Sequence, residues 1–345
     1  MYIYIMSKNL LKLSLLCVVF FLGKTTSLAQ DNMMQKKPIT LIQPPYLKAG
    51  DTVAIVAPSG VLKNRTLEIE KAIALLKSWE LEVVVGKHVF NQNNHFAGTD
   101  AERSEDFQNA LNNPNIKAIW CARGGYGTVR ILDALDFTTF KEHPKWIIGY
   151  SDITALHNQI HNEGVESIHA MMCTSLQDGA ENIKETISTF NTAIFGKPLA
   201  YTLKGSKYNK PGNVCAPLVG GNLSILYSML GSNTSIDTSG KILFIEEIGE
   251  YEYSIDRMLQ SLKRAGYFND CKGLIVGDIS KIRKNTTLWG SSVQQLILDA
   301  LAEYNFPIAF NMPAGHEKDN RAMILGRTVE INVGKDISTL VFESY

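Results

Sequence analysis

The chain is 345 residues long, with 45% hydrophobic and 20% charged residues, and its formal net charge is zero. This composition is typical of a globular protein, and the length allows about two domains of ordinary size. Because a neutral chain lacks the excess of Lys and Arg that binds nucleic acids and anionic membranes, we expect neither as a partner.

The first 29 residues have the pattern of a secretory signal. Lys8 and Lys12 precede or enter the apolar run Leu13–Gly23. The small residues of Ser27–Ala29 stand where a signal peptidase reads the chain. The apolar run is short for a membrane span, so we predict cleavage before Gln30, export to the periplasm and no stable membrane insertion afterwards. An uncleaved anchor is the alternative.

Residues 30–46 are polar, contain a Pro-Pro pair and predict a linker. Beyond the signal the chain keeps four cysteines, none of them in CxxC spacing, which disfavours a zinc site. Their apolar, strand-like surroundings favour free thiols over disulfides. We expect no metal and no cofactor. The four cysteines are Cys121, Cys173, Cys215 and Cys271.

Strand and helix patterns alternate from residue 47 to residue 175, which predicts an N-terminal α/β domain. The expected strands are Thr52–Ala57, Leu81–Val85, Ile116–Ala122 and Trp146–Tyr150. The expected helices are Thr66–Trp79, Asp100–Leu111, Asp152–His161 and one that follows Gly127 through Leu135. Such alternation favours a parallel sheet with helices on both faces, which binds ligands beyond the carboxyl ends of its strands.

Residues 176–212 show little periodicity after a helical piece and are interpreted as an interdomain connection. Residues 213–345 then predict a smaller C-terminal α/β domain that is rich in strands. It begins with a Gly-Gly-Asn turn at 220–222. Its expected strands are Ile242–Ile245, Gly273–Gly277 and several within Met323–Phe342, and its expected helices are Ser254–Ala265 and Ser292–Tyr304.

The segment Lys145–Thr154 holds the first candidate for chemistry, Ser151. An apolar strand ends there and a helix pattern follows at once. A serine in this position is exposed among free backbone N–H groups, as a nucleophile would be, but the same position also suits an ordinary helix N-cap. The local pattern leaves both interpretations open.

A serine nucleophile needs a base and a group that orients the base. His316 ends a strand and opens a loop, so it is the candidate base. Glu246 ends a buried apolar strand, where a carboxylate is costly unless it is paired. Its neighbour Glu247 is then the solvated acid, although composition does not rank the two. The alternative is a capping serine, a surface acid and a loop histidine.

A glycine-rich loop and a pair of helical histidines are two further candidates for a functional site. The loop Arg123–Gly127 is glycine-rich and could hold an oxyanion with its N–H groups, but it lacks the phosphate-binding motifs that a nucleotide site requires. His157 and His161 imitate the histidine pair of a zinc protease helix. Asn158 replaces the general-base glutamate of that motif, which disfavours a metal-dependent hydrolase.

Taken together, several segments resemble those of LD-carboxypeptidases, serine peptidases that also include the microcin C immunity hydrolases. The resemblance runs from about 47 to 342 and implies an N-terminal α/β domain, a smaller C-terminal domain, a groove between them and a homodimer. Each segment alone is a weak signal, but their order along the chain is specific. The segments are Leu47–Asp51, Ala122–Gly127, Ile148–Thr154, Glu246–Leu259 and Pro313–His316.

The resemblance also assigns roles. The Ser–Glu–His triad of the family falls on Ser151, Glu246 and His316. The oxyanion donors fall on the backbone N–H groups of Asp152 and Gly125.

Arg123 is a candidate for binding the terminal carboxylate of the substrate, and His169 is a second candidate substrate-binding residue. The implied reaction releases terminal D-alanine from a muropeptide tetrapeptide by cutting after the L-centre of a diamino acid, diaminopimelate or lysine. Export departs from the best-known members, which act in the cytoplasm. Hydrolysis of an aminoacyl-nucleotide and non-catalytic muropeptide binding are the alternatives.

Overall fold

A computed structural model describes residues 41–344. Residues from Leu41 onward form one compact unit by their contacts. The predicted signal, residues 1–29, and most of the predicted linker lie outside the described residues. Within residues 41–344, no helix combines the length and the apolar character needed to cross a bilayer.

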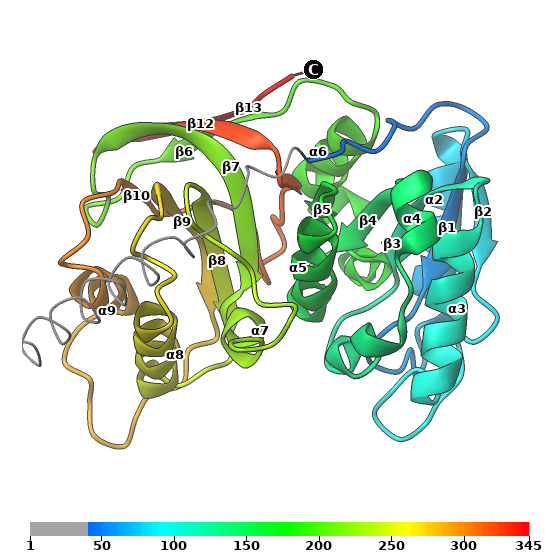
Figure 1. Cartoon of the computed structure of the whole chain (residues 1–345), viewed down its shortest axis with the longest axis horizontal. Coiled ribbons are helices and arrows are strands. Elements are labelled where there is room, and N and C mark those ends of the chain that lie inside the picture. Colours follow the sequence, from blue (N-terminus) through cyan, green and yellow to red (C-terminus); the bar gives the residue numbers. More distant parts are fainter. Residues whose placement is uncertain (1–40, 345) are drawn as a thin grey trace, which may run out of the picture. The chain divides into compact units, whose positions relative to one another are not determined.

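The first sheet has six strands in the order β11-β5-β4-β3-β1-β2 (Figure 1). The five N-terminal strands are parallel to one another. They are β1 (Thr52–Val56), β2 (Glu82–Val85), β3 (Ile116–Cys121), β4 (Trp146–Gly149) and β5 (Ser167–His169). β11 (Met323–Leu325) comes from the far end of the chain and pairs antiparallel with β5.

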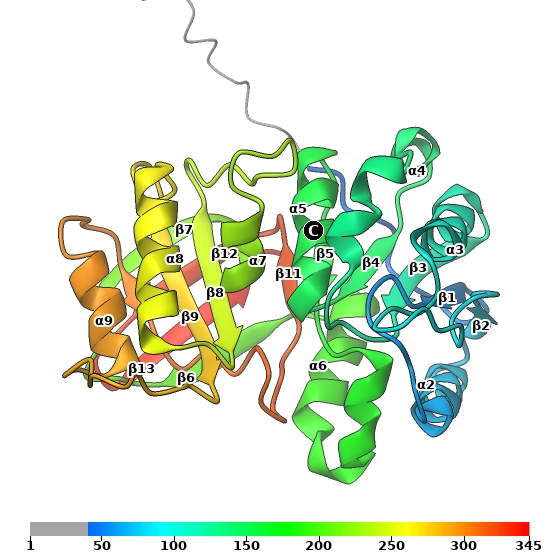
Figure 2. The ribbon, with the colours of Figure 1, turned by 90° about the horizontal axis from the view of Figure 1, so that it is seen from below.

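Helices cover both faces of this sheet because its strands are buried on both sides. Along β1, Val53 and Ile55 pack into one core and Ala54 and Val56 into another, the two-residue period of a strand. α2 (Thr66–Ser78) and α6 (Lys184–Ile194) lie on the first side, and α3 (Asp100–Asn112) and α5 (Thr154–Asn162) lie on the second (Figure 2). The short α4 (Thr138–Glu142) also adds Phe140 to the second core.

The second sheet has seven strands in the order β10-β9-β8-β7-β12-β13-β6. Its parallel part is β7 (Gly212–Asn222), β8 (Ile242–Ile248), β9 (Gly273–Ser280) and β10 (Ile308–Ala309). Its antiparallel part is β12 (Thr328–Val333), β13 (Ile337–Phe342) and β6 (Ala200–Lys204). α7 (Leu223–Ser228), α8 (Glu252–Arg264) and α9 (Val293–Ala300) enclose a separate apolar core against β8 and β9. The expected α/β fold class is confirmed.

One apolar core joins the two sheets, because residues of both, such as Ile55 and Phe244, belong to the same buried cluster. A buried ion pair reinforces this junction. Arg327, just before β12, donates to both carboxylate oxygens of Glu166, just before β5, and the shared bidentate geometry is the strongest form of this pair. The strands that carry the candidate site are therefore held in one rigid frame.

Two local expectations were wrong. The Gly-Gly-Asn segment at 220–222 is the end of β7 and not a turn. A Cβ on Gly221 would lie 2.4 Å from the Oγ1 atom of Thr154, so glycine is needed there for the close approach of β7 to α5. The helix expected after Gly127 consists of two 3₁₀ turns, Thr128–Arg130 and Leu132–Ala134.

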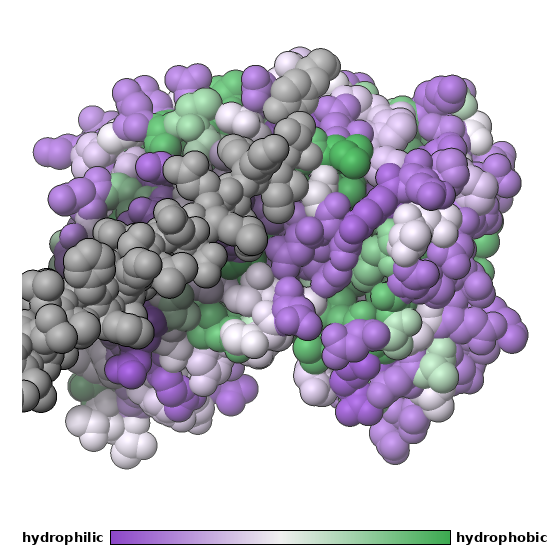
Figure 3. Space-filling view, in the orientation of Figure 1, coloured by the Kyte–Doolittle hydropathy of each residue, from purple (hydrophilic) through white to green (hydrophobic). Residues whose placement is uncertain are grey.

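The two expected connecting segments contain ordered contacts. Residues 176–212 include α6 and also β6, which pairs with β13 at the edge of the second sheet. At the start of the described chain, the carbonyl of Pro45 accepts a hydrogen bond from the Trp146 indole, and Tyr46 stacks on the same indole. On the face drawn in Figure 3, hydrophilic residues cover most of the surface around the first sheet, and hydrophobic ones form small separate areas.

Candidate active site

Ser151 follows β4 and is the first residue of the 3₁₀ turn Ser151–Ile153, which leads into α5. Its φ of 62° is in the left-handed region, which is strained for a residue with a side chain and is associated with functional sites. The alternative N-cap role is wrong: Tyr150 takes the cap position, and the Ser151 hydroxyl bonds elsewhere. The strained turn presents the hydroxyl at the carboxyl end of β4.

A hydrogen-bond chain connects Ser151 with the other two predicted residues. The Oγ atom of Ser151 lies 2.9 Å from Nε2 of His316, and Nδ1 of His316 lies 2.7 Å from Oε2 of Glu246. Ser151 comes from the first sheet and Glu246 from β8 of the second. The three residues form one chain only because the two sheets meet.

Backbone contacts fix His316 at the junction. The N–H of Gly315 donates to Asn320, and the N–H of Glu317 donates to Oδ2 of Asp278 on β9. Gly315 has a φ of 142°, and a Cβ there would lie 2.9 Å from Cβ of Asp278, so glycine is required beside the histidine. The imidazole is therefore oriented from both sides.

The surroundings of His316 favour a protonated ring. Burial lowers the pKa of His316, but the charge and hydrogen bond of Glu246, together with the charges of Glu247 and Asp278, outweigh it, so the pKa is raised above its ordinary value. Glu246 is fully buried, and its Oε1 atom has no hydrogen-bond partner among residues 41–344. Its charge stabilises the protonated form of His316.

The expectation that Glu247 is the solvated acid of the pair was wrong. Glu247 is only 2% exposed and points to the other side of β8. Its carboxylate accepts hydrogen bonds from the N–H and hydroxyl of Ser224, the N–H of Ile248 and the amide of Asn222. Burial, and then the charge of Glu246, raise the pKa of Glu247, and the hydrogen bonds from Ser224 and Ile248 oppose that shift. Its role is to hold β8 against α7.

The loop that precedes the 3₁₀ turns lies against Ser151. A Cβ built on Gly124 would lie 3.2 Å from Cβ and 3.4 Å from Oγ of Ser151. Neither Asp152 nor Gly125 donates its backbone N–H to a protein acceptor within residues 41–344. The Asp152 side chain ties the loop down by accepting the N–H of Thr128 at 2.9 Å. Gly124 was not among the residues predicted for the site, although the glycine pair 124–125 signals a close backbone approach.

The two predicted substrate-binding residues differ in accessibility. Arg123 is partly exposed, and its guanidinium donates to the carbonyl of Val61. Burial, and then the charge of Arg65, lower its pKa. His169 is fully buried against the rings of Tyr150 and Phe244, so no surface of this side chain is open to a substrate. Desolvation holds the pKa of His169 well below its usual value.

The helical histidine pair serves packing. His157 is buried and bonds through its two ring nitrogens to Ser167 and to the carbonyl of Gly149 at the end of β4. Burial lowers the pKa of both His157 and His161 to about 4, which keeps the rings neutral. No group of three or more His, Cys, Asp or Glu side chains within the described range is arranged to hold a metal ion.

Two neighbours of His316, Tyr150 and Asp278, were not predicted from the sequence. The Tyr150 ring meets the imidazole edge-on, with the centroids 5.0 Å apart, and burial raises the pKa of Tyr150 to about 12. Asp278 lies next to Gly315, and its pKa is raised to about 6, first by burial and then by Glu317 and Glu246. Tyr150 adjoins Ser151 in sequence and could have been found there. No local signal marks Asp278.

Two family models match the chain in order. The model for the N-terminal domain of LD-carboxypeptidases matches residues 53–170, and that for the C-terminal domain matches residues 216–331. The chain belongs to the LD-carboxypeptidase family. The resemblance expected from the sequence is therefore confirmed, and the protein is a serine-type carboxypeptidase.

Known members of this family match nearly the whole described chain. A probable murein peptide carboxypeptidase of Bacillus subtilis strain 168 is 34% identical over 86% of this chain and 94% of its own length. The crystal structure of a muramoyltetrapeptide carboxypeptidase from Oxalobacter formigenes is 29% identical with a TM-score of 0.78, covering 85% of this chain and 99% of that one. The microcin C7 self-immunity protein MccF shares the fold at 22% identity and a TM-score of 0.79, covering 89% and 99%.

Proposed function

We propose that this LD-carboxypeptidase releases terminal D-alanine from muropeptide tetrapeptides through Ser151, His316 and Glu246. The observation that carries the proposal is the continuous hydrogen-bond chain between these three side chains. The family membership and the printed names of its relatives support the substrate class.

In this mechanism Ser151 attacks the carbonyl carbon of the scissile bond while His316 accepts the hydroxyl proton at Nε2. Glu246 holds the imidazole in the required orientation and stabilises its charged form. His316 then returns the proton to the leaving amine of D-alanine, and an acyl-enzyme on Ser151 remains. Water, deprotonated by His316, hydrolyses that ester and restores the free enzyme.

The oxyanion of each tetrahedral intermediate is held by the N–H groups of Asp152 and Gly125. Both groups lie beside the nucleophile in the chain or the loop and lack protein acceptors within residues 41–344, which supports this role. One such donor lowers the activation free energy by about 3 kcal/mol. Arg123, which keeps guanidinium N–H groups beyond its bond to Val61, binds the free carboxylate of D-alanine.

Further parts of the proposal concern the whole protein. Residues 47–175 and 213–345 act as two domains with the site in the groove between them, residues 1–29 direct export to the periplasm, and two copies form a homodimer. Export places the enzyme where wall-derived muropeptides are released. Fractionation of cells that express the full chain and light scattering of the mature protein test these points.

Hydrolysis of an aminoacyl-nucleotide is the second candidate. The segment between Glu246 and Asp256 is short, which leaves little room for an added loop. It does, however, expose Tyr251 and Tyr253, whose phenol groups can contact a ligand. The likeness to MccF supports only the fold at this level of identity.

The test is the release of D-alanine from purified tetrapeptide by wild-type protein, Ser151→Ala and the matched control Ser228→Ala, whose side chain lies on α7. We expect Ser151→Ala to lower kcat at least about 10³-fold, Ser228→Ala to leave it unchanged, and EDTA to have no effect. Turnover that survives in Ser151→Ala, or that EDTA abolishes, would contradict the proposal and favour a metal-dependent hydrolase. Binding without turnover in the wild type would favour the non-catalytic alternative.

A further inference from the structure

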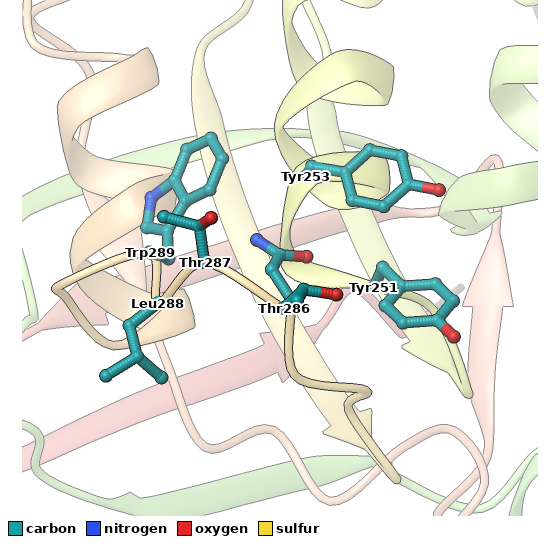
Figure 4. A pocket seen from close by; sticks show the side chains of 7 residues that line it. Tyr251, Tyr253, Thr286, Thr287, Leu288 and Trp289 are labelled. Atoms are coloured by element: carbon teal, nitrogen blue, oxygen red, sulfur yellow. The ribbon is translucent and has the colours of Figure 1, made fainter.

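An open cavity of about 750 Å³ lies outside the candidate active site, between the segments that follow β8 and β9 (Figure 4). β8 carries Glu246 and β9 carries Asp278, so the cavity and the candidate site share the carboxyl edge of the second sheet. Its lining includes Tyr251, Tyr253, Thr286, Thr287, Leu288 and Trp289.

The cavity gathers exposed apolar side chains. Thirteen large hydrophobic side chains are exposed within the described chain, and four of them line this one cavity. Leu288 is 78% exposed and Trp289 38% exposed. Isolated exposed hydrophobics are normal, but a cluster of this kind marks a place that binds something.

The two segments are held together before any ligand arrives. The N–H of Arg283 donates to the carbonyl of Glu250, and the N–H of Glu252 donates to the carbonyl of Arg283. Lys284 pairs with the buried carboxylate of Glu252 at 2.9 Å. A ligand therefore meets a formed cavity and loses little affinity to ordering of the protein.

The walls of the cavity differ in chemistry. Tyr251 and Tyr253 stack on each other, with centroids 5.5 Å apart, and arginines lie over both rings, so their faces are largely covered. Both tyrosines are partly exposed, Tyr251 by 37% and Tyr253 by 47%. Trp289, on the opposite side in Figure 4, makes no ring or cation contact in the described part of the chain. One side thus offers hydroxyl groups and the other an open indole face.

These groups match a neutral sugar ring. A pyranose has an apolar C–H face, which packs on an indole, and a rim of hydroxyl groups, which bond to short polar side chains such as Thr286, Thr287 and the amide of Asn285. A nucleotide would bring a phosphate, and no Lys or Arg is among the lining residues, since Arg257 and Arg283 lie over the tyrosine rings instead. The lining therefore favours an uncharged sugar over an aminoacyl-nucleotide.

We propose that this cavity binds the sugar of the muropeptide whose peptide end reaches Ser151. The inference rests on the proposed function, which supplies the substrate class. Tyr251 follows Glu246 by five residues, so the chain limits their separation to roughly 18 Å. The three peptide residues between the scissile bond and the sugar extend roughly 10 Å, and the sugar and its linkage add to that length. The enzyme therefore prefers sugar-bearing muropeptides to free peptides.

The test compares kcat/KM for a disaccharide-tetrapeptide with that for the same tetrapeptide without sugar. We expect wild-type protein to favour the sugar-bearing substrate by about tenfold or more, and Trp289→Ala to bring this ratio close to one. Tyr227→Ala is the matched control, because Tyr227 is exposed on α7 and does not line the cavity. It should leave the ratio unchanged.

A second measurement does not depend on turnover. Titration of the disaccharide alone should change the tryptophan fluorescence of wild-type protein and not that of Trp289→Ala. Equal kcat/KM for the two substrates in wild-type protein overturns the sugar site while the carboxypeptidase function stands. A fluorescence change with adenosine monophosphate but not with the disaccharide also overturns it. Absence of D-alanine release from both substrates contradicts the proposed function instead, and the titration still tests the sugar site.

Discussion

Adjacent residues Glu246 and Glu247 provide the sharpest test of the candidate site, because the same substitution has opposite expected effects on each. Glu246→Gln keeps the shape of the side chain and removes the charge that stabilises the His316 imidazolium. The equivalent acid-to-amide change in a serine peptidase of another fold lowers kcat about 10⁴-fold. We expect a loss of about 10³- to 10⁴-fold with little change in stability.

Glu247→Gln should instead lower stability and spare turnover. The Glu247 carboxylate accepts four hydrogen bonds, two on each oxygen, and an amide nitrogen in place of one oxygen loses two of them. At about 1 to 1.5 kcal/mol each, the loss is roughly 2 to 3 kcal/mol. Removal of a buried charge offsets part of it, since burial already raises the pKa of Glu247. A net loss of about 2 kcal/mol is expected.

Urea unfolding and D-alanine release on both variants measure the two effects. A stable Glu247→Gln protein with greatly reduced kcat, together with an active Glu246→Gln protein, would exchange the roles of the two acids and refute the assignment. Loss of kcat in both variants without loss of stability would also contradict the assignment, because Glu247 would then support turnover and not stability.

Two further predictions concern the neighbours of Ser151 and His316. His316 must be neutral to accept a proton, and its pKa is raised, so kcat/KM should rise with pH through a value above 6.5. Asp278→Asn removes one of the charges that raise the pKa of His316 and should move this rise to lower pH. An unchanged pH profile in Asp278→Asn would contradict the influence of Asp278 on His316. Gly124→Ala should lower kcat about tenfold or more with little change in Tm, since the added Cβ would lie only 3.2 Å from Cβ of Ser151 and would displace the nucleophile. Full activity of this variant would mean that the loop moves to accommodate the methyl group.

Much of the fold could be predicted because its signals are local. The β-branched runs and helical periods of the first sheet gave bounds within a residue or two of β1, α2, α3 and β3. Predictions failed where a distant partner decides the structure. Gly220 and Gly221 look like a turn in sequence, but they end β7 because the backbone must pass close to α5. β6 alternates buried and exposed residues over only five positions, and its hydrogen-bonding partner β13 comes from the other end of the chain, which no neighbouring residue indicates.

The same distinction applies to the candidate site. His169 ends a strand, as Ser151 and Glu246 nearly do, and its sequence does not reveal that Tyr150 and Phe244 bury its ring. Adjacent acids on a strand point to opposite faces, so composition offers no way to choose between Glu246 and Glu247. Asp278 is one of several acids near a strand end and became relevant only through its contact with the segment around His316.

Neighbours a few positions apart are enough to predict the alternation of strands and helices, the family, and the residue types at the carboxyl ends of β4 and β8. They are not enough to predict that Ser151 meets His316 across 165 positions of chain, or which glutamate bonds to that histidine, because both depend on how the two sheets pack. The antiparallel pairing of β11 with β5, the shared apolar core and the buried pair of Arg327 with Glu166 set that packing, and no local pattern encodes it.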